Sequence, residues 1–207
     1  MMTRWGTNRI EAFSDGVFAI AITLLVLDLS VPETSDDLLQ DILDAWPSYL
    51  AYGTSFLTIG GIWLAHHALF ARLRQVSASL LRANLLLLMA VSFVPYPTRL
   101  VAESIHNESA ERTAVVFYGL TLLVVAIIAA VMWRFVAFSP DLLRPEFSID
   151  EVRSLARRAE PNLAFYAGFT AFGLVAPRAA AFGYIVVAIL QVMRVRGDEA
   201  PAGVAAT

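Results

Sequence analysis

Six apolar segments occupy most of this 207-residue chain, and short polar connections separate them. Hydrophobic residues make up 58% of the sequence and charged residues 16%, whereas soluble domains are about 45–50% apolar and about 25% charged. So few polar residues cannot cover a globular surface in water. The composition therefore predicts an all-α membrane protein, and at about 20 apolar residues per spanning helix the chain could hold five or six spans. The six apolar segments predict six transmembrane helices. The expected spans cover residues 10–31, 46–70, 80–100, 114–138, 161–176 and 179–193.

The last two segments are short, at or below the lower limit of about 17 residues for a span. They are joined by Pro177 and Arg178, so they are expected to form a tight helical hairpin. Pro161 is expected at the first position of the fifth helix, where the missing N–H of proline costs no hydrogen bond. Residues 1–196 thus form one transmembrane domain, and the small, polar tail over 197–207 is expected to be disordered.

Two prolines, Pro95 and Pro97, lie near the end of the third segment. Proline lacks a backbone N–H and leaves carbonyls of the preceding turn without a partner, so these residues are expected to kink or stop the helix. The favoured interpretation is a helix end at the membrane interface, with Tyr96 as an aromatic anchor.

The arginines are unevenly distributed between the two sides of the expected spans. The sequence contains no lysine, so arginine supplies all 15 cations. Three arginines lie on one side: Arg99, Arg112 and Arg178. The other twelve flank the two termini and the second and fourth connections: Arg4, Arg9, Arg72, Arg74, Arg82, Arg134, Arg144, Arg153, Arg157, Arg158, Arg194 and Arg196. Because positive charge is retained on the cytoplasmic side, both termini are predicted to be cytoplasmic, which requires an even number of spans.

The first outward connection is strongly acidic and contains no arginine. Five carboxylates could raise the local concentration of cations if a pore opens there. The alternative is an ordinary solvated loop on the translocated side. The residues concerned are Glu33, Asp36, Asp37, Asp41 and Asp44.

Polar and ionisable residues interrupt the first apolar segment. Charges within a span are rare and usually face the interior of a helix bundle, where they have partners. Asp15 follows Arg9 by about a turn and a half, so it is expected below the membrane surface. At 100° per residue, Asp15 lies about 140° from Ile20 around the helix, and Ser14 lies about 120° away in the other sense. The full run is Arg9-Ile10-Glu11-Ala12-Phe13-Ser14-Asp15-Gly16.

A second face of the same helix is a line of mostly apolar side chains. Phe13 and Leu27 lie within about 20° of Ile20, and Thr23 and Leu24 flank that residue at about 60° and 40°. Taken alone, such a stripe is more often a lipid-facing or packing surface than the lining of a pore.

Two adjacent histidines, His66 and His67, lie in the second segment and point about 100° apart. With no cysteine and no second histidine four residues away, they do not form a zinc motif. A structural hydrogen-bond network is favoured over proton relay or catalysis, because an unpartnered buried imidazole is costly. The candidate partners are Asp15, Ser14, Arg9 and Asn84.

The run Arg9-x-x-x-Phe13-Ser14-Asp15-Gly16 resembles the first-helix signature of the transmembrane protein 175 family of potassium-conducting channels. Trp63, the pair His66-His67, Asn84 and Pro95 extend the resemblance, together with the six-span layout. The similarity covers most of the chain from Arg9 to about Met193 and is that of a bacterial member with one six-helix repeat.

This resemblance implies a homotetramer in which the first helix of each subunit lines a central pore without a carbonyl selectivity filter. It implies that Ile20 forms the constriction, that Leu24 and Leu27 form further apolar narrowings, and that Thr23 is linked to cation preference. It also implies a structural network among the first three spans. Its members here are Arg9, Phe13, Ser14, Asp15, Trp63, His66, His67 and Asn84.

The sequence therefore predicts a potassium-selective channel that conducts passively through a hydrophobic gate in the cell membrane. Asp28, about 80° round from Ile20, is a further candidate for the outer mouth. The alternative is a proton-coupled or cation secondary transporter that uses Asp15 and His66 or His67, although no inverted repeat is evident. Neither an enzyme nor a nucleic-acid-binding protein is expected. The expected partners are other copies of the chain, lipid and permeant K⁺, with no cofactor and no bound metal.

Overall fold

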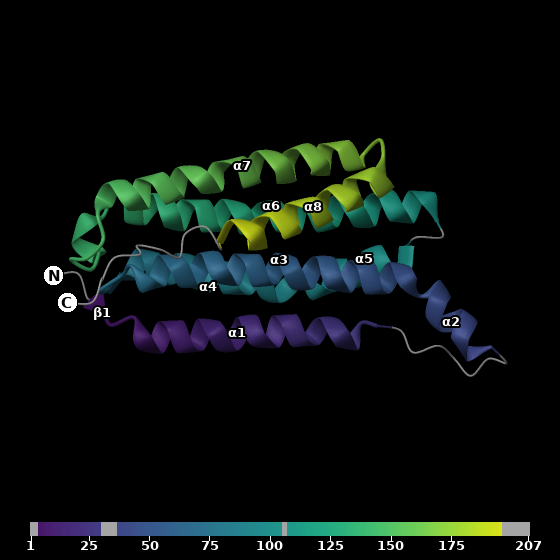
Figure 1. The fold of residues 1–207 in the computed structure, drawn as a ribbon, viewed down its shortest axis with the longest axis horizontal. Helices are drawn as coiled ribbons and strands as arrows, with labels where there is room; N and C mark the ends of the chain where they lie inside the picture. The colour runs from purple at the N-terminus through teal and green to yellow at the C-terminus, as the bar shows by residue number, and fades with distance from the viewer. Residues whose placement is uncertain (1–3, 30–36, 105–106, 196–207) are drawn as a thin grey trace, which may run out of the picture.

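Helices form nearly all of the computed structural model, which describes residues 4–29, 37–104 and 107–195. Figure 1 shows a long bundle with α1 along one edge, α6 and α7 along the other, and α3 and α4 between them. The helices are α1 (Asn8–Leu27), α2 (Leu38–Asp44), α3 (Trp46–Ala71), α4 (Ala78–Phe93), α5 (Pro95–Ser104), α6 (Glu108–Ala137), α7 (Ile149–Gly173) and α8 (Pro177–Val195), with a 3₁₀ turn, η1 (Pro140–Leu142). Two short strands, β1 (Arg4–Trp5) and β2 (Val76–Ser77), complete the fold.

The start of α7 differs from the sequence prediction. Pro161 lies inside this helix and not at its first position. The helix begins at Ile149, because the Ser148 side chain accepts a hydrogen bond from the Glu151 backbone N–H, which is a capping signal that the prediction overlooked. Packing of α7 along α6 supports the helix across the proline. The fifth helix therefore continues well beyond the expected span on the arginine-rich side.

The connection between α7 and α8 also differs from the prediction. The turn is formed by residues 174–176, and Pro177 is the first residue of α8. A proline at this position loses no helical hydrogen bond. The hairpin itself is present, since α7 and α8 pack against each other. The expected tail over 197–207 lies outside the described residues.

The third apolar segment is interrupted at Val94. Helix α4 ends at Phe93, and α5 begins at Pro95 and continues to Ser104. The break agrees with the predicted effect of the two prolines, and Tyr96 is 54% exposed. The segment nevertheless continues as helix past the break. Helices α4 and α5 together, over Ala78–Ser104, are long and apolar enough to cross a membrane.

The core is continuous along the bundle. Its fully buried side chains include Phe18 of α1, Ile59 and Phe70 of α3, Leu122 of α6 and Tyr184 of α8. Close packing in the half formed by α6, α7 and α8 depends on Gly119. A Cβ atom there would collide with the hydroxyls of Tyr184 and Thr170.

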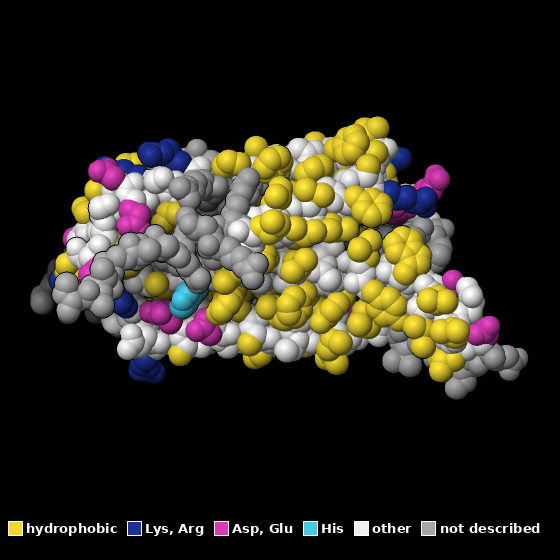
Figure 2. All heavy atoms as spheres, viewed as in Figure 1, with side chains coloured by type: hydrophobic (Ala, Val, Ile, Leu, Met, Phe, Trp, Pro, Cys, Tyr) yellow, Lys and Arg dark blue, Asp and Glu magenta, His cyan; other side chains and the backbone are white. Residues whose placement is uncertain are grey.

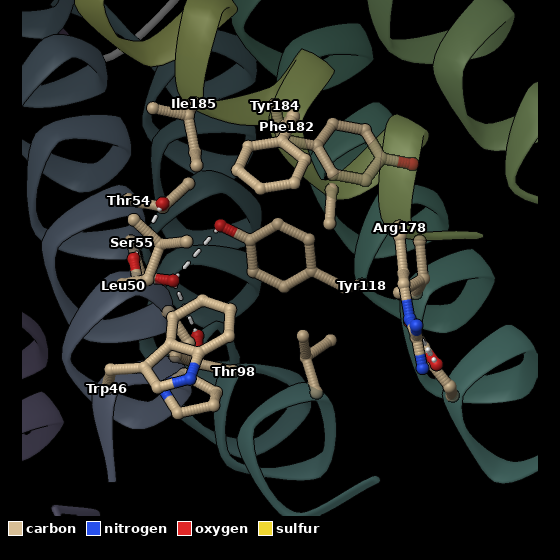
Figure 3. Close-up of a pocket in the computed structure, with 16 residues that line it drawn as sticks. Trp46, Leu50, Thr54, Ser55, Thr98, Tyr118, Arg178, Phe182, Tyr184 and Ile185 are labelled. Carbon is tan, nitrogen blue, oxygen red and sulfur yellow. Dashed lines mark hydrogen bonds and ion pairs between the residues drawn. The ribbon is translucent and has the colours of Figure 1, made fainter. Parts of the chain in front are cut away.

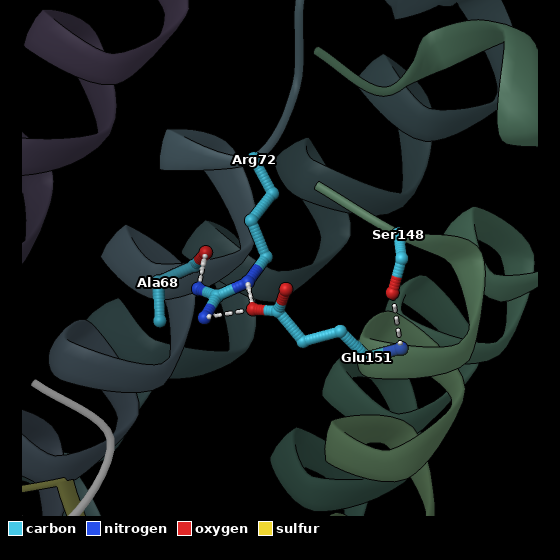
Figure 4. A network of polar contacts seen from close by, with 4 residues as sticks. All are labelled: Ala68, Arg72, Ser148 and Glu151. Carbon is cyan, nitrogen blue, oxygen red and sulfur yellow. Dashed lines mark hydrogen bonds and ion pairs between the residues drawn. The ribbon is translucent and has the colours of Figure 1, made fainter. Parts of the chain in front are cut away.

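The end of the bundle that carries β1 is held together by backbone and ionic contacts. Strand β1 pairs antiparallel with β2, with Arg4 opposite Ser77 and Trp5 opposite Val76. Arg72 joins α3 to α7, because its Nε and Nη2 atoms donate to Glu151 Oε1 at 3.2 and 3.0 Å (Figure 4). Its Nη1 donates to the Ala68 carbonyl at 2.7 Å. The segment before α1 and the start of α7 are thus both tied to the α3–α4 connection.

Among the described residues, three helical segments are long and apolar enough to cross a membrane: Asn8–Leu27, Ala78–Ser104 and Glu108–Ala137. A shorter apolar helix covers Pro177–Met193. On the face that carries α3 and α8, apolar side chains cover the surface toward the α2 end (Figure 2). A surface of this kind is expected to contact lipid or another protein rather than water.

Candidate functional site

Helix α1 has one exposed and one buried face. Ser14, Phe18, Ala21 and Leu25 are at most 1% exposed and face the bundle. The predicted pore-lining side chains lie on the other face of α1. Figure 1 shows that this helix runs along one edge of the bundle. Their exposed fractions are 61% for Ile20, 41% for Leu24 and 76% for Leu27, and Thr23 is also exposed. Phe13, a member of the predicted structural network, shares this face and is 56% exposed. The single chain thus presents this predominantly apolar stripe outward.

Asn84 connects the buried face of α1 to two other helices. Its Nδ2 donates to Ser14 Oγ at 3.0 Å, and its Oδ1 lies 2.8 Å from His66 Nε2. All three side chains are buried, at 0%, 0% and 4% exposed for Asn84, Ser14 and His66. One amide therefore ties α4 to α1 and α3.

The direction of each hydrogen bond in this cluster follows from one hydroxyl. Ser14 Oγ donates its proton to the Ile10 carbonyl at 2.8 Å. It can therefore only accept from Asn84, which orients the amide so that its oxygen faces His66. Because a carbonyl oxygen has no proton to give, Nε2 of His66 must carry the hydrogen.

Aromatic rings enclose His66. The Phe70 ring stacks on the imidazole at a centroid distance of 4.3 Å, and the Phe18 ring lies 5.4 Å away. Sequence reasoning missed Phe18, although it follows Ser14 by four residues and so shares its helix face. It also missed Glu11, whose Oε1 atom is buried without a hydrogen-bond partner among the described residues.

A second polar contact joins α1 to α3. Trp63 Nε1 donates to Asp15 Oδ1 at 2.9 Å. The Trp63 ring also lies 5.9 Å from the ring of His67. Asp15 and His66 therefore have different partners, and neither hydrogen-bonds to the other. A direct Asp15–His66 relay is not formed.

Three members of the predicted network are exposed: Arg9, Phe13 and His67. Of these, His67 contacts the network through the ring of Trp63. Within the described residues, none of the three side chains forms a hydrogen bond to another member. Their place in a network stays a prediction.

The acidic residues near the other end of α1 have local partners. Asp37 accepts from the Gln40 backbone N–H and caps α2, and Asp44 accepts from Gln40 Nε2 at 3.0 Å. Asp28 follows the last residue of α1, where partial burial raises the pKa of its carboxyl and the Arg99 guanidinium opposes that shift. Glu33 and Asp36 lie outside the described residues. Within the described ranges, no three His, Cys, Asp or Glu side chains group in a way that could hold a metal ion.

Comparison with known proteins identifies the family. A model of the endosomal/lysosomal potassium channel TMEM175 matches residues 9–95. A potassium channel of Streptomyces collinus is 39% identical over 150 residues, which are 72% of this chain and 73% of that protein. A potassium channel of Chamaesiphon minutus is 42% identical over 156 residues, or 73% and 76% of the two chains. The chain belongs to the TMEM175 family.

The TMEM175 fold is also recognised in three dimensions. The crystal structure of a lysosomal potassium-selective channel TMEM175 homolog from Chamaesiphon minutus matches with a TM-score of 0.82 at 36% identity. The match covers 91% of this chain and 97% of that one. The family resemblance predicted from the sequence is thereby confirmed. TMEM175 is a family of ion channels, so this chain is a membrane protein and not an enzyme.

The TMEM175 family match coincides with the polar cluster. Its limits, residues 9–95, enclose α3 and α4 and nearly all of α1. All twelve predicted site residues lie within these limits, from Arg9 to Asn84. The region that characterises the family is therefore the one that presents the exposed stripe and holds it against the bundle.

Proposed function

We propose that this chain is a potassium-selective cation channel. Four subunits are proposed to surround a central path with α1 of each subunit facing it, so that the path has no carbonyl filter. Support comes from the potassium channels of Streptomyces collinus and Chamaesiphon minutus to which the chain is similar. It also comes from the outward stripe of α1, which a tetramer would bring around one axis.

The exposed stripe of α1 is the observation that carries this proposal. Ile20 is 61% and Leu27 76% exposed, whereas Phe18 and Leu25, on the buried face, are 1% exposed. Four copies of Ile20 would form a narrow apolar ring that resists water and ions, as in gates that work by dewetting. Leu24 and Leu27 would line the path one and two turns farther out.

Thr23 supplies the polar element of the proposed path. Its Oγ1 donates to the Ile20 carbonyl at 3.0 Å, so the hydroxyl proton is held within α1. Only oxygen lone pairs remain to face the path. Because lone pairs attract cations, a ring of Thr23 oxygens would favour the entry of K⁺ over that of an anion.

We further propose six spans with both termini in the cytoplasm of the cell. Helices α1, α3, α6, α7 and α8 would each cross the bilayer once, and α4 and α5 would cross it together. The imbalance of twelve to three among the 15 arginines supports this orientation. The polar first half of α7, which begins at Ile149, would then lie on the cytoplasmic side.

Ion flux from purified protein in liposomes tests the proposal. Wild-type protein is expected to release K⁺ down its electrochemical gradient, with slower flux under an equal Na⁺ gradient. Ile20→Asn is expected to raise K⁺ conductance, because a polar ring removes the barrier to hydration. Val131→Asn is the control, since Val131 of α6 is comparably exposed at 53% but lies away from α1. Absence of flux from oligomeric wild-type protein would refute the channel.

A further inference from the structure

A cavity of about 310 Å³ lies between α3, α5, α6 and α8, near the end of the bundle that carries α2 (Figure 3). Cavities that hold small ligands are commonly about 300–1,000 Å³. Within the described residues, no side chain of α1 lines it. The cavity is therefore separate from the proposed ion path.

Three hydroxyls at the base of the cavity have no free proton. Thr98 Oγ1 donates to the Val94 carbonyl at 2.8 Å. The contact of 2.8 Å between Ser55 and Thr98 must then use the Ser55 proton, and the contact of 3.0 Å between Tyr118 and Ser55 must use the Tyr118 proton. The chain of hydrogen bonds seen in Figure 3 thus runs in one direction, from Tyr118 through Ser55 to Thr98.

Two further hydroxyls on the wall, those of Thr54 and Tyr184, also use their protons in hydrogen bonds within the protein. Thr54 Oγ1 donates to the Leu50 carbonyl at 2.7 Å. Thr170 donates to the Tyr166 carbonyl at 2.6 Å, so Tyr184 must donate to Thr170 across their 3.2 Å contact. The hydroxyls of the described lining residues therefore offer a ligand no proton, so none of them holds a polar ligand by donation. An apolar chain fits such a surface best.

The rim carries one cationic donor. Arg178 Nε donates to both carboxylate oxygens of Glu111, at 3.0 and 3.2 Å. The Glu111 side chain is 5% exposed, and that of Arg178 is 70% exposed. Within the described residues, these bonds use Nε alone, so both NH₂ groups of the guanidinium remain available. Glu111 holds in place a guanidinium whose free side can bind a phosphate.

The cavity extends inward from the level of Arg178. From Arg178 to Ile185 it follows α8 for about 10 Å, and from Trp46 to Ser55 it follows α3 for about 14 Å, at about 1.5 Å per residue. Trp46 is 55% and Phe182 56% exposed. An exposed tryptophan at the start of a spanning helix is typical of the interface of a bilayer. Figure 2 shows that the face carrying α3 and α8 is apolar toward the α2 end.

We propose that this cavity holds one acyl chain of a membrane phospholipid and that Arg178 binds the phosphate of the same molecule. The apolar interior takes the chain, and among the described lining residues the one cationic donor stands at the rim, where a headgroup lies. This site does not depend on the proposed conduction of K⁺, because it can be measured without ion flux.

Native mass spectrometry of the purified protein, released from detergent after incubation with phosphatidylglycerol, tests the proposal. Wild-type protein is expected to retain one lipid per chain. Ala181→Phe places a ring in the cavity and is expected to abolish retention. Arg178→Gln is expected to lower occupancy about tenfold, through the loss of charge-assisted hydrogen bonds.

Arg112→Gln is the matched control, since Arg112 is an exposed arginine at the same end that does not line the cavity. It is expected to retain lipid as the wild type does. If Ala181→Phe fails to fold, as judged by its elution from a sizing column, Ala51→Leu fills the cavity from α3 instead. Equal retention in all variants, an equal loss in Arg112→Gln, or displacement of the lipid by inorganic phosphate alone would overturn the site.

Discussion

The side-chain amide of Asn84 donates to the hydroxyl of Ser14 at 3.0 Å, and this contact joins α4 to the buried face of α1. The same amide accepts from His66 of α3 at 2.8 Å. Because α1 carries the stripe proposed to line the ion path, the Asn84 side chain helps to set the direction in which that stripe faces.

Asn84→Leu is expected to destabilise the protein by about 1–3 kcal/mol, because it leaves the Ser14 oxygen and the His66 N–H buried without partners. The measurement is thermal unfolding in a mild detergent. Gln40→Ala removes an exposed amide on α2 and should change the transition little. A loss of stability in Gln40→Ala as large as that in Asn84→Leu would contradict this role of Asn84.

Trp63→Phe keeps an aromatic ring in place but removes the N–H that Asp15 accepts at 2.9 Å. The expected loss is about 1–3 kcal/mol, since the lost bond ends on a carboxylate. Asp15→Asn retains an acceptor oxygen and should lose less. The free energies of unfolding of the two variants, measured in urea, check the prediction. A larger loss in Asp15→Asn than in Trp63→Phe would show that the bond between these two side chains is not the main contribution of Asp15 to stability.

Thr23→Ala is expected to lower the preference for K⁺ over Cl⁻, because it removes the oxygen lone pairs that we place beside the path. Thr23→Ser keeps the oxygen and should preserve the preference. Reversal potentials under a gradient of KCl give the ratio of the two permeabilities directly. An unchanged ratio in Thr23→Ala would remove Thr23 from the proposed path.

Gly119→Ala is expected to destabilise the fold by about 1–3 kcal/mol, since a Cβ atom there collides with Tyr184 and Thr170. Gly53→Ala is the matched control on α3, because no atom lies within 4 Å of a Cβ at that position. It should be more stable than the wild type by about 0.5–1 kcal/mol through helix propensity. Thermal unfolding distinguishes the two, and similar shifts would contradict the packing described for α6.

The helical positions of the polar residues could be predicted from the sequence, but their pairing could not. Periodicity within α1 separates Ser14 from Ile20 and predicts opposite environments for them. It does not contain the register between helices, which decides that Asn84 and not Asp15 reaches His66. An amide suits that place because it donates on one side and accepts on the other, and no spacing along the chain reveals this.

The beginning of α7 shows a second limit of the sequence. Hydropathy predicts a helix that starts at Pro161, because it marks where a helix enters the lipid and not where the helix itself begins. The capping residue Ser148 and the first-turn carboxylate of Glu151 start the helix in a polar segment. Hydropathy and capping are separate signals. Because the capping residue here precedes the start of the apolar segment, the two signals together predict a helix that continues out of the bilayer.

The pairing of Trp5 with Val76 holds the chain just before α1 in a two-stranded ladder. Any tilt of α1 therefore turns about its first end, and the displacement of each residue grows with its distance from that end. At about 1.5 Å per residue, Ile20 lies about 18 Å and Leu27 about 28 Å from Asn8. A small rotation at the β1 end is thus amplified along the helix, and Leu27 moves about half as far again as Ile20.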